Sequence, residues 1–319
     1  MLVVHAAPPH PTRVVGATTP GAAVWFDLLD PTPQEIAHVE AETGLDLPSR
    51  EDMQEIEVSS RLAQQGDALL MTATVMSKAD SDTPEASAIT FLVAPAALVT
   101  LRYSDPKPFA TFRQRLQRNP ALAANSDLVF VALMETIVDR IADVLESIST
   151  EIDALARDVF DRSDEAAGSE ALEEALQRIG RAGTMLSTLS ESIVGLGRAV
   201  AFFGSAAAPW LHKETKHHLK PIGRDLKSLN DQVGFLSHKT NFLLDATLGL
   251  ISIEQNRIIK IFTIAAVTFM PPTLIASIYG MNFAAMPELQ WVMGYPMAVA
   301  LMVLAAALPL VWFRRQGWL

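Results

Sequence analysis

The stretch from Tyr279 to Trp291, YGMNFAAMPELQW, contains the residue types most suited to binding an ion. It places one glycine, one asparagine and a single carboxylate, Glu288, between two long apolar runs. Asparagine offers a carboxamide oxygen, and glycine lets the backbone turn closely or bring its own carbonyl groups near an ion. Because the chain has no cysteine, thiolate metal sites and cysteine nucleophiles are excluded, and oxygen ligands must carry any metal chemistry.

The apolar runs on both sides are long enough to cross a membrane. No charged residue occurs from Ile261 to Pro287 or from Leu289 to Phe313, and aromatic residues stand at the ends of the second run. We therefore predict transmembrane helices at 261–281 and 295–314, joined by a short external loop at 282–294. A buried helical hairpin of a soluble protein is the alternative, and two adjacent runs of this length disfavour it.

The flanking charges predict the orientation of these spans. Arg257 and Lys260 precede the first span, Arg314 and Arg315 follow the second, and the connecting segment has no Lys or Arg. By the positive-inside rule both termini face the cytoplasm, with a basic cytoplasmic tail at 315–319. The N-terminus has no basic region and no apolar stretch of signal-peptide length, so we expect residue 1 to remain on the cytoplasmic side. Together with the two spans, this predicts a multi-pass protein of the cell inner (plasma) membrane.

Charge is distributed unevenly along the chain. Residues 1–209 contain 15 Lys and Arg against 30 Asp and Glu, whereas residues 210–319 contain 10 against 6. An acidic front part repels nucleic acid and attracts cations, and a basic rear part suits an anionic lipid bilayer. Nucleic acid is therefore not an expected partner.

The first two thirds of the chain have a pattern that predicts an α+β cytoplasmic domain at 1–209. A small α/β subdomain is indicated by β-like runs at 22–30, 68–76, 88–94 and 97–103 and by a helix at 32–44 that Thr32 or Asp30 could cap. Apolar residues then recur at three- and four-residue steps over 134–159 and 172–203, which predicts two long antiparallel helices. A third helix, starting near Pro221, forms a stalk at 210–260 that continues into the first span.

At this point the residues resemble a known family. The motifs YGMN at the end of the first span, MPEL, GYP, the second span and a basic end closing in WL are similar to those of the CorA family of magnesium transport proteins. The resemblance implies a funnel-shaped homopentamer whose first spans surround a central pore. It also implies a divalent cation channel that takes up Mg²⁺, and Co²⁺ or Ni²⁺ as well, with neither enzymatic activity nor an organic cofactor.

The resemblance assigns roles to particular residues. Gly280, Met281 and Asn282 form the selectivity filter, where a ring of asparagine amides holds a hydrated ion, since Mg²⁺ dehydrates reluctantly. One helical face lines the pore and forms its apolar gate: Asn256, Ile259, Phe262, Ala266, Met270, Thr273 and Ser277. A ring of Glu288 attracts cations to the loop. The chain departs from the family where an acidic residue commonly follows GMNF, because it has Ala284 there, and this weakens the expected capture of cations.

Regulation is expected from the acidic cytoplasmic part. In proteins that this chain resembles, intracellular Mg²⁺ bridges carboxylates of neighbouring subunits and holds the pore shut. Such feedback requires a ligand that prefers the closed state. Asp245, on the stalk, is the candidate for one side of this bridge, and a solvated or salt-bridged stalk residue is the alternative.

The sequence leaves two other functions as alternatives. A Zn²⁺ transporter of the same superfamily is one, although MPEL after GMNF favours magnesium, and His212, His217 and His218 are not spaced to meet on one helical face. A membrane-anchored sensor or enzyme is the other. Against it, the chain has no GxxxxGK, HExxH, GxSxG or glycine-rich dinucleotide turn.

Overall fold

The computed structural model describes residues 1–6, 13–14, 23–55, 57, 61–79, 81, 84–161, 169–282 and 286–318. Its elements in chain order are β1 (Leu2–Ala6), β2 (Arg13–Val14), β3 (Ala23–Leu29), α1 (Pro33–Thr43), η1 (Asp52–Gln54), β4 (Leu62–Gln65), β5 (Ala68–Ser77), β6 (Glu85–Val93), β7 (Leu98–Arg102), α3 (Lys107–Arg118), η2 (Pro120–Ala123), α4 (Ser126–Asp161), α5 (Ser169–Ala206), α6 (Lys213–Tyr279), η4 (Pro287–Gln290) and α7 (Gly294–Arg315). They form two compact units: Met1–Asp164 with Ala175–Leu244, and Glu165–Glu174 with Asp245–Leu319.

The first unit contains a seven-stranded mixed sheet with the order β2-β1-β3-β7-β6-β5-β4. Strands β3 and β7 pair in parallel, and the other neighbours pair antiparallel. The four β-like runs of the sequence correspond to β3, β5, β6 and β7, and the helix expected at 32–44 is α1. Strands β1, β2 and β4 and helix α3 were not predicted. The mixed sheet with long helices confirms an α+β domain.

Helical elements cover both faces of this sheet. On one face, Val39 of α1 and Met53 of η1 pack into a buried cluster with Phe26, Leu92 and other strand residues. On the other face, Phe91 of β6 contacts Phe130 of α4, with ring centroids 5.8 Å apart. Because strand side chains alternate between faces, neighbours such as Phe91 and Leu92 serve opposite cores.

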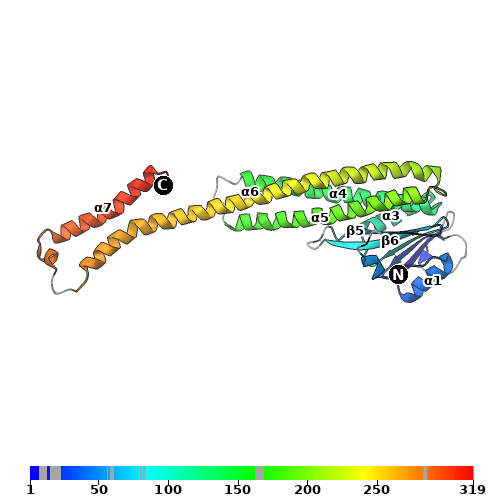
Figure 1. Ribbon diagram of the computed structural model, residues 1–319, viewed down its shortest axis with the longest axis horizontal. Helices are drawn as coiled ribbons and strands as arrows, with labels where there is room; N and C mark the ends of the chain where they lie inside the picture. Colours follow the sequence, from blue (N-terminus) through cyan, green and yellow to red (C-terminus); the bar gives the residue numbers. More distant parts are fainter. Residues whose placement is uncertain are drawn as a thin grey trace. The chain divides into compact units, whose positions relative to one another are not determined.

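The long helices of the first unit run as the apolar periodicity predicted. Phe130, near the start of α4, contacts Phe203 near the end of α5, with ring centroids 4.5 Å apart. Asp158, near the end of α4, pairs with Arg178 near the start of α5 at 3.4 Å. Helices α4 and α5 are therefore antiparallel, and in Figure 1 they lie beside each other along the first part of α6.

Helix α6 starts earlier than predicted. The expected start near Pro221 is wrong, because the helix begins at Lys213 and Pro221 lies inside it. The buried carboxylate of Asp127, at the start of α4, accepts hydrogen bonds from the backbone N–H of His212 at 3.0 Å and lies 2.9 Å from its ring Nδ1. This carboxylate occupies the position of a helix cap, which fixes the start of α6 eight residues before the proline.

Candidate functional site

The glycine of the GMN motif ends helix α6 in a close turn. The Gly280 N–H donates to the Ala276 carbonyl at 2.9 Å, and the Met281 N–H donates to the Ile278 carbonyl at 3.3 Å. A Cβ at position 280 would lie 3.1 Å from the Ala276 oxygen, which is tighter than an ordinary contact. Gly280 therefore allows the helix to finish with its last carbonyl groups closely packed.

Asn282 lies just beyond this turn, with its side chain exposed. Its carboxamide makes no hydrogen bond to any other residue within the described part of the chain. An exposed amide has two donors and a carbonyl oxygen to offer a passing hydrated ion. Ala284 lies outside the described residues, so its position in the loop is not assigned.

The second half of the loop packs against the start of α7. The Gly294 N–H donates to the Trp291 carbonyl at 2.9 Å, and the Trp291 N–H donates to the Glu288 carbonyl at 3.4 Å. A Cβ at Gly294 would lie only 2.2 Å from the Glu288 carbonyl oxygen, so this position requires glycine. The Glu288 side chain remains exposed. Gly294 was not among the predicted site residues, although it belongs to the GYP motif that carried the resemblance.

All seven residues predicted to line a pore are exposed within the chain. Ile259, Phe262 and Met270 are the large apolar ones, with 60%, 71% and 70% of their surface accessible. The less exposed residues between Ile261 and Tyr279 are Thr263, Ile264, Thr268, Pro271, Pro272, Ile275 and Tyr279. At 3.6 residues per turn most of them lie on the side of the helix away from the predicted pore-lining face, and Thr263 is the one that lies beside that face. The chain by itself thus leaves an apolar face uncovered.

Three described helices are long and apolar enough to cross a membrane, namely α5 over Ala171–Ala206, α6 and α7. The most apolar windows of α6 and α7 are 0% and 11% buried, whereas 44% of that of α5 is buried in the first unit. Since α5 packs against α4 and the sheet, α6 and α7 are the candidates for the membrane. They match the two spans expected from the sequence.

The ends of the two candidate spans lie together. The Lys260 ammonium stands 5.6 Å from the ring centroid of Trp318, and Trp318 stacks on Phe313 with centroids 5.3 Å apart. A cation over an aromatic face is an attractive contact. The start of the first span and the end of the second are therefore on the same side, as a helical hairpin requires.

The predicted metal-ligating residues do not meet within one chain. Asp245 is exposed, and the described residues contain no group of three or more His, Asp or Glu side chains placed to hold a metal ion. The histidines considered for zinc are separated: His212 lies 2.9 Å from Asp127, and His218 lies 2.9 Å from Glu135. Among the described residues, Asp245 therefore belongs to no group of three or more such side chains that could hold a metal ion.

Comparisons with known proteins show the family of the chain. The family model described as "CorA-like Mg2+ transporter protein" matches residues 20–315. The "Magnesium transport protein CorA" of Pasteurella multocida is 34% identical over 298 residues, which cover 93% of this chain and 92% of that protein.

Two solved structures share the fold. The complete CorA magnesium transporter of Methanocaldococcus jannaschii is 18% identical and has a TM-score of 0.77, covering 100% of this chain and 98% of that one. The ZntB cytoplasmic domain of Vibrio parahaemolyticus is 13% identical and has a TM-score of 0.58, covering 81% of this chain and 97% of that one.

Proposed function

The chain belongs to the family of CorA-like Mg²⁺ transporters and transports Mg²⁺ across a membrane, and from this premise we propose how its residues select, gate and regulate the ion. Sequence identity of 34% over nearly the whole chain with a magnesium transport protein is the observation that carries the function. The likeness to the ZntB domain concerns the fold alone, so zinc is the weaker alternative.

Selection takes place, in this proposal, at a ring of Asn282 side chains at the outer mouth. Five copies of the chain would bring five exposed amides to one axis, since the two spans of a single chain cannot enclose a pore. Neutral oxygens suit an ion that keeps its water shell, because they replace second-shell water rather than first-shell ligands. Gly280 supports the ring by ending α6 in the close turn that presents Asn282.

The pore would be lined by the uncovered face of α6. Ile259, Phe262 and Met270 would then form apolar rings that close by excluding water, and Asn256, Thr273 and Ser277 would supply polar positions between them, with Ala266 as a small residue. The exposure of all seven side chains supports this assignment. Glu288 would raise the local cation concentration at the mouth.

The orientation and regulation belong to the same proposal. Arg257, Lys260, Arg314 and Arg315 would face the cytoplasm, which places both termini inside and the GMN loop outside the cell inner membrane. Intracellular Mg²⁺ would bind between copies at Asp245 and stabilise the closed pore.

The test is Mg²⁺ flux into liposomes containing the purified full-length chain, with Zn²⁺, Co²⁺ and Ni²⁺ as competing ions. We expect saturable Mg²⁺ uptake, and we expect Asn282→Ala to reduce it at least tenfold, because one amide per subunit is lost from the site. Asn230→Ala, on the exposed part of α6 in the first unit, is the matched control and should leave uptake unchanged. Unaltered uptake and ion preference in Asn282→Ala would refute the amide ring while leaving the transport function in place.

A further inference from the structure

The second unit carries cations at the end of its two candidate spans. Lys260 directly precedes the apolar run of α6, and Arg314 and Arg315 directly follow that of α7. All three side chains are exposed, and within the described part of the chain no carboxylate forms an ion pair with them. The carboxylate nearest to Lys260 along the chain, Glu254, pairs instead with Arg257 at 3.6 Å.

A Schellman turn fixes the structure of this end of α7. The Trp318 N–H donates to the Phe313 carbonyl at 3.1 Å, and the Gly317 N–H donates to the Arg314 carbonyl at 3.3 Å. Gly317 has φ +71°, which favours glycine, and the turn brings Trp318 back to stack on the buried Phe313. The Lys260 ammonium lies 5.6 Å from the Trp318 ring centroid, so the start of the α6 run lies beside the same turn.

An exposed apolar stripe of α7 leads to the arginines. Its residues recur at steps of three and four, so they lie on one face of the helix: Leu301, Leu304, Leu308 and Val311. Between 49% and 67% of each side chain is accessible, and Arg315 continues the same face four residues after Val311. From Leu301 to Arg315 the face is about 21 Å long, whereas one leaflet of hydrocarbon is about 15 Å thick. An apolar stripe of leaflet length that ends in a cation matches a lipid whose acyl chains are attached to an anion.

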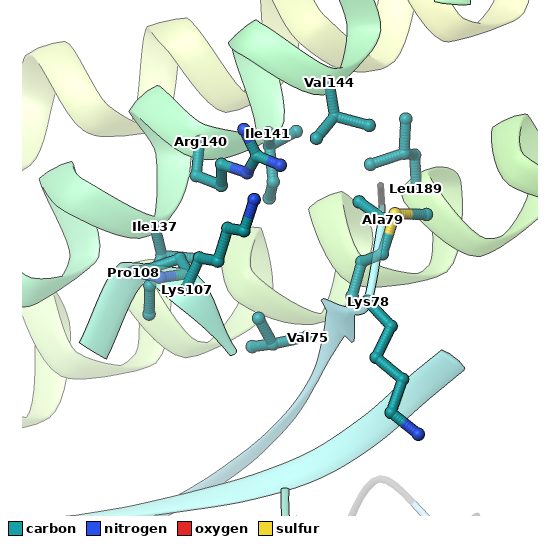
Figure 2. A pocket seen from close by; sticks show the side chains of 11 residues that line it. Val75, Lys78, Ala79, Lys107, Pro108, Ile137, Arg140, Ile141, Val144 and Leu189 are labelled. Atoms are coloured by element: carbon teal, nitrogen blue, oxygen red, sulfur yellow. The ribbon is translucent and has the colours of Figure 1, made fainter. Parts of the chain in front are cut away.

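Cations of the first unit are placed differently. Arg102 and Arg113 pair with the buried carboxylate of Asp27 at 2.8 and 3.0 Å. Figure 2 shows Lys107 and Arg140 beside an apolar pocket, but its cavity is about 30 Å³, which is room for a water molecule. A larger anion finds no space in that pocket, whereas the cations of the second unit stand on an open surface.

We propose that this end of the hairpin binds an anionic phospholipid, with the phosphate at Arg314 and Arg315, beside Lys260, and the acyl chains along the apolar stripe of α7. A guanidinium matches a phosphate through two parallel hydrogen bonds, and each Lys or Arg near an anionic lipid surface strengthens binding about fivefold. A second copy of the chain suits this face less well. Parallel copies place their arginines at the same level, where like charges repel. The proposal rests on the membrane placement of α6 and α7 given above.

The test is native mass spectrometry of the purified full-length chain in detergent micelles that contain phosphatidylglycerol and phosphatidylcholine in equal amounts, with identical acyl chains. We expect at least about tenfold more bound phosphatidylglycerol, because two arginines face its net negative headgroup. Soluble glycerol 3-phosphate in tenfold excess should leave this lipid bound, because it has the phosphate but no acyl chains to place on the stripe.

Three paired variants connect the preference to the arginines. Arg314→Gln with Arg315→Gln should reduce it to about twofold or less. Arg314→Lys with Arg315→Lys keeps both charges and should keep the preference, which separates loss of charge from loss of structure. Arg224→Gln with Lys227→Gln removes the same charge from exposed positions of α6 in the first unit and should have no effect.

Four results would each overturn the proposal. They are equal binding of the two lipids to the unmodified chain, a preference that survives the glutamine pair at 314 and 315, a loss that is equal in the lysine pair or the control pair, and displacement by glycerol 3-phosphate. Bound lipid is measured without ion flux, so any of these results leaves Mg²⁺ transport untouched. Absent Mg²⁺ uptake by a chain that keeps its lipid preference would instead count against the proposed ion pathway.

Discussion

At the scale of single residues, the loop between the spans depends on two glycines that act differently. Gly280 closes the last turn of α6, where an added Cβ would meet one carbonyl oxygen at 3.1 Å and small adjustments could relieve the contact. Gly294 faces the Glu288 carbonyl oxygen at 2.2 Å from an ideal Cβ, a distance that only backbone movement can relieve. The shape of the loop from Met286 to Gly294 thus depends strictly on Gly294, whereas Gly280 acts at the end of α6.

Gly294→Ala is therefore expected to displace the η4 turn and destabilise the chain by about 1–3 kcal/mol, as overpacking does elsewhere. Thermal unfolding in detergent should show a lower midpoint and Mg²⁺ flux should fall, because Glu288 moves with the turn. Gly180→Ala is the matched control, since nothing lies within 4 Å of its Cβ and alanine favours a helix. An unfolding midpoint and flux equal to those of the unmodified chain would show that the loop tolerates the methyl group.

At the scale of elements, the sequence predicts a helix end correctly where the residues that cap it are close together in the chain. Thr32 caps α1, its hydroxyl accepting from the Glu35 N–H while the Glu35 carboxylate accepts from the Thr32 N–H, and Gly44 ends the helix with φ +71°. Such a capping box is visible within four residues of sequence. The start of α6 was misplaced because its cap, Asp127, is 85 residues away in the chain. Strand β1 was not predicted, because its five residues form a strand by pairing with β2 and β3 and carry no strong local signal.

The strand β1 also contains a buried histidine with a consequence for stability. His5 is 2% exposed and stacks on Trp25, with ring centroids 4.3 Å apart. Burial lowers the pKa of His5 from 6.5 to about 4, opposed by the charge of Asp27 and assisted by that of Arg113. The unfolded chain therefore binds a proton at this site between pH 6.5 and about 4, and the folded chain does not. Stability from this group is present above pH 6.5 and is lost as the pH falls through that window.

His5→Phe should remove this part of the acid sensitivity while keeping the stacking on Trp25. The unmodified chain is expected to lose up to about 3 kcal/mol more than the variant between pH 7 and pH 4. Unfolding midpoints of the full-length chain over this range measure the difference. His38→Gln changes a half-buried histidine of α1 that lies 3.4 Å from Glu42, and it serves as the control for a histidine outside the core. Parallel pH profiles for His5→Phe and the unmodified chain would contradict the buried neutral histidine.

The uncovered face of α6 can be tested at the scale of the helix. Met270→Asp would replace the apolar ring at position 270 with a ring of carboxylates, one from each copy, which should wet the constriction and raise basal cation flux several-fold in assembled protein. Ala265→Asp, also exposed but about a third of a turn away from the middle of this face, would put the same charge toward lipid. Within the membrane such a charge costs about 3 kcal/mol, so Ala265→Asp should lower insertion rather than open the pore. Assembled Met270→Asp with ordinary flux and ion preference would reject this face as the pore lining.

At the scale of the whole molecule, the site is incomplete in one chain. The exposed amide of Asn282, the apolar face of α6 and the exposed carboxylate of Asp245 each lack partners within the described residues of a single copy. Sequence reasoning could name these residues through a family resemblance, because the motif lies in one short segment. It could not name a partner for Asp245, because the proposed ion bridge between copies would form through assembly and not through any pattern along the chain.

Asp245→Ala tests whether internal Mg²⁺, bound between copies of the chain, closes the pore. If Asp245 is one ligand of an ion bridging two copies, then a higher internal Mg²⁺ concentration should be needed to halve the flux after its loss. We expect this concentration to rise about tenfold, which is within the usual range of coupling between sites. The measurement is flux into liposomes preloaded with graded Mg²⁺. Asp231→Ala removes the same charge from an exposed position of the same helix and should leave the closing concentration unchanged. An equal shift in both variants would indicate a general effect of charge, and no shift in Asp245→Ala would remove this carboxylate from the bridge. A higher closing concentration of Mg²⁺ in Asp245→Ala, with no change in Asp231→Ala, is the result that would show that an ion bound at Asp245 stabilises the closed pore.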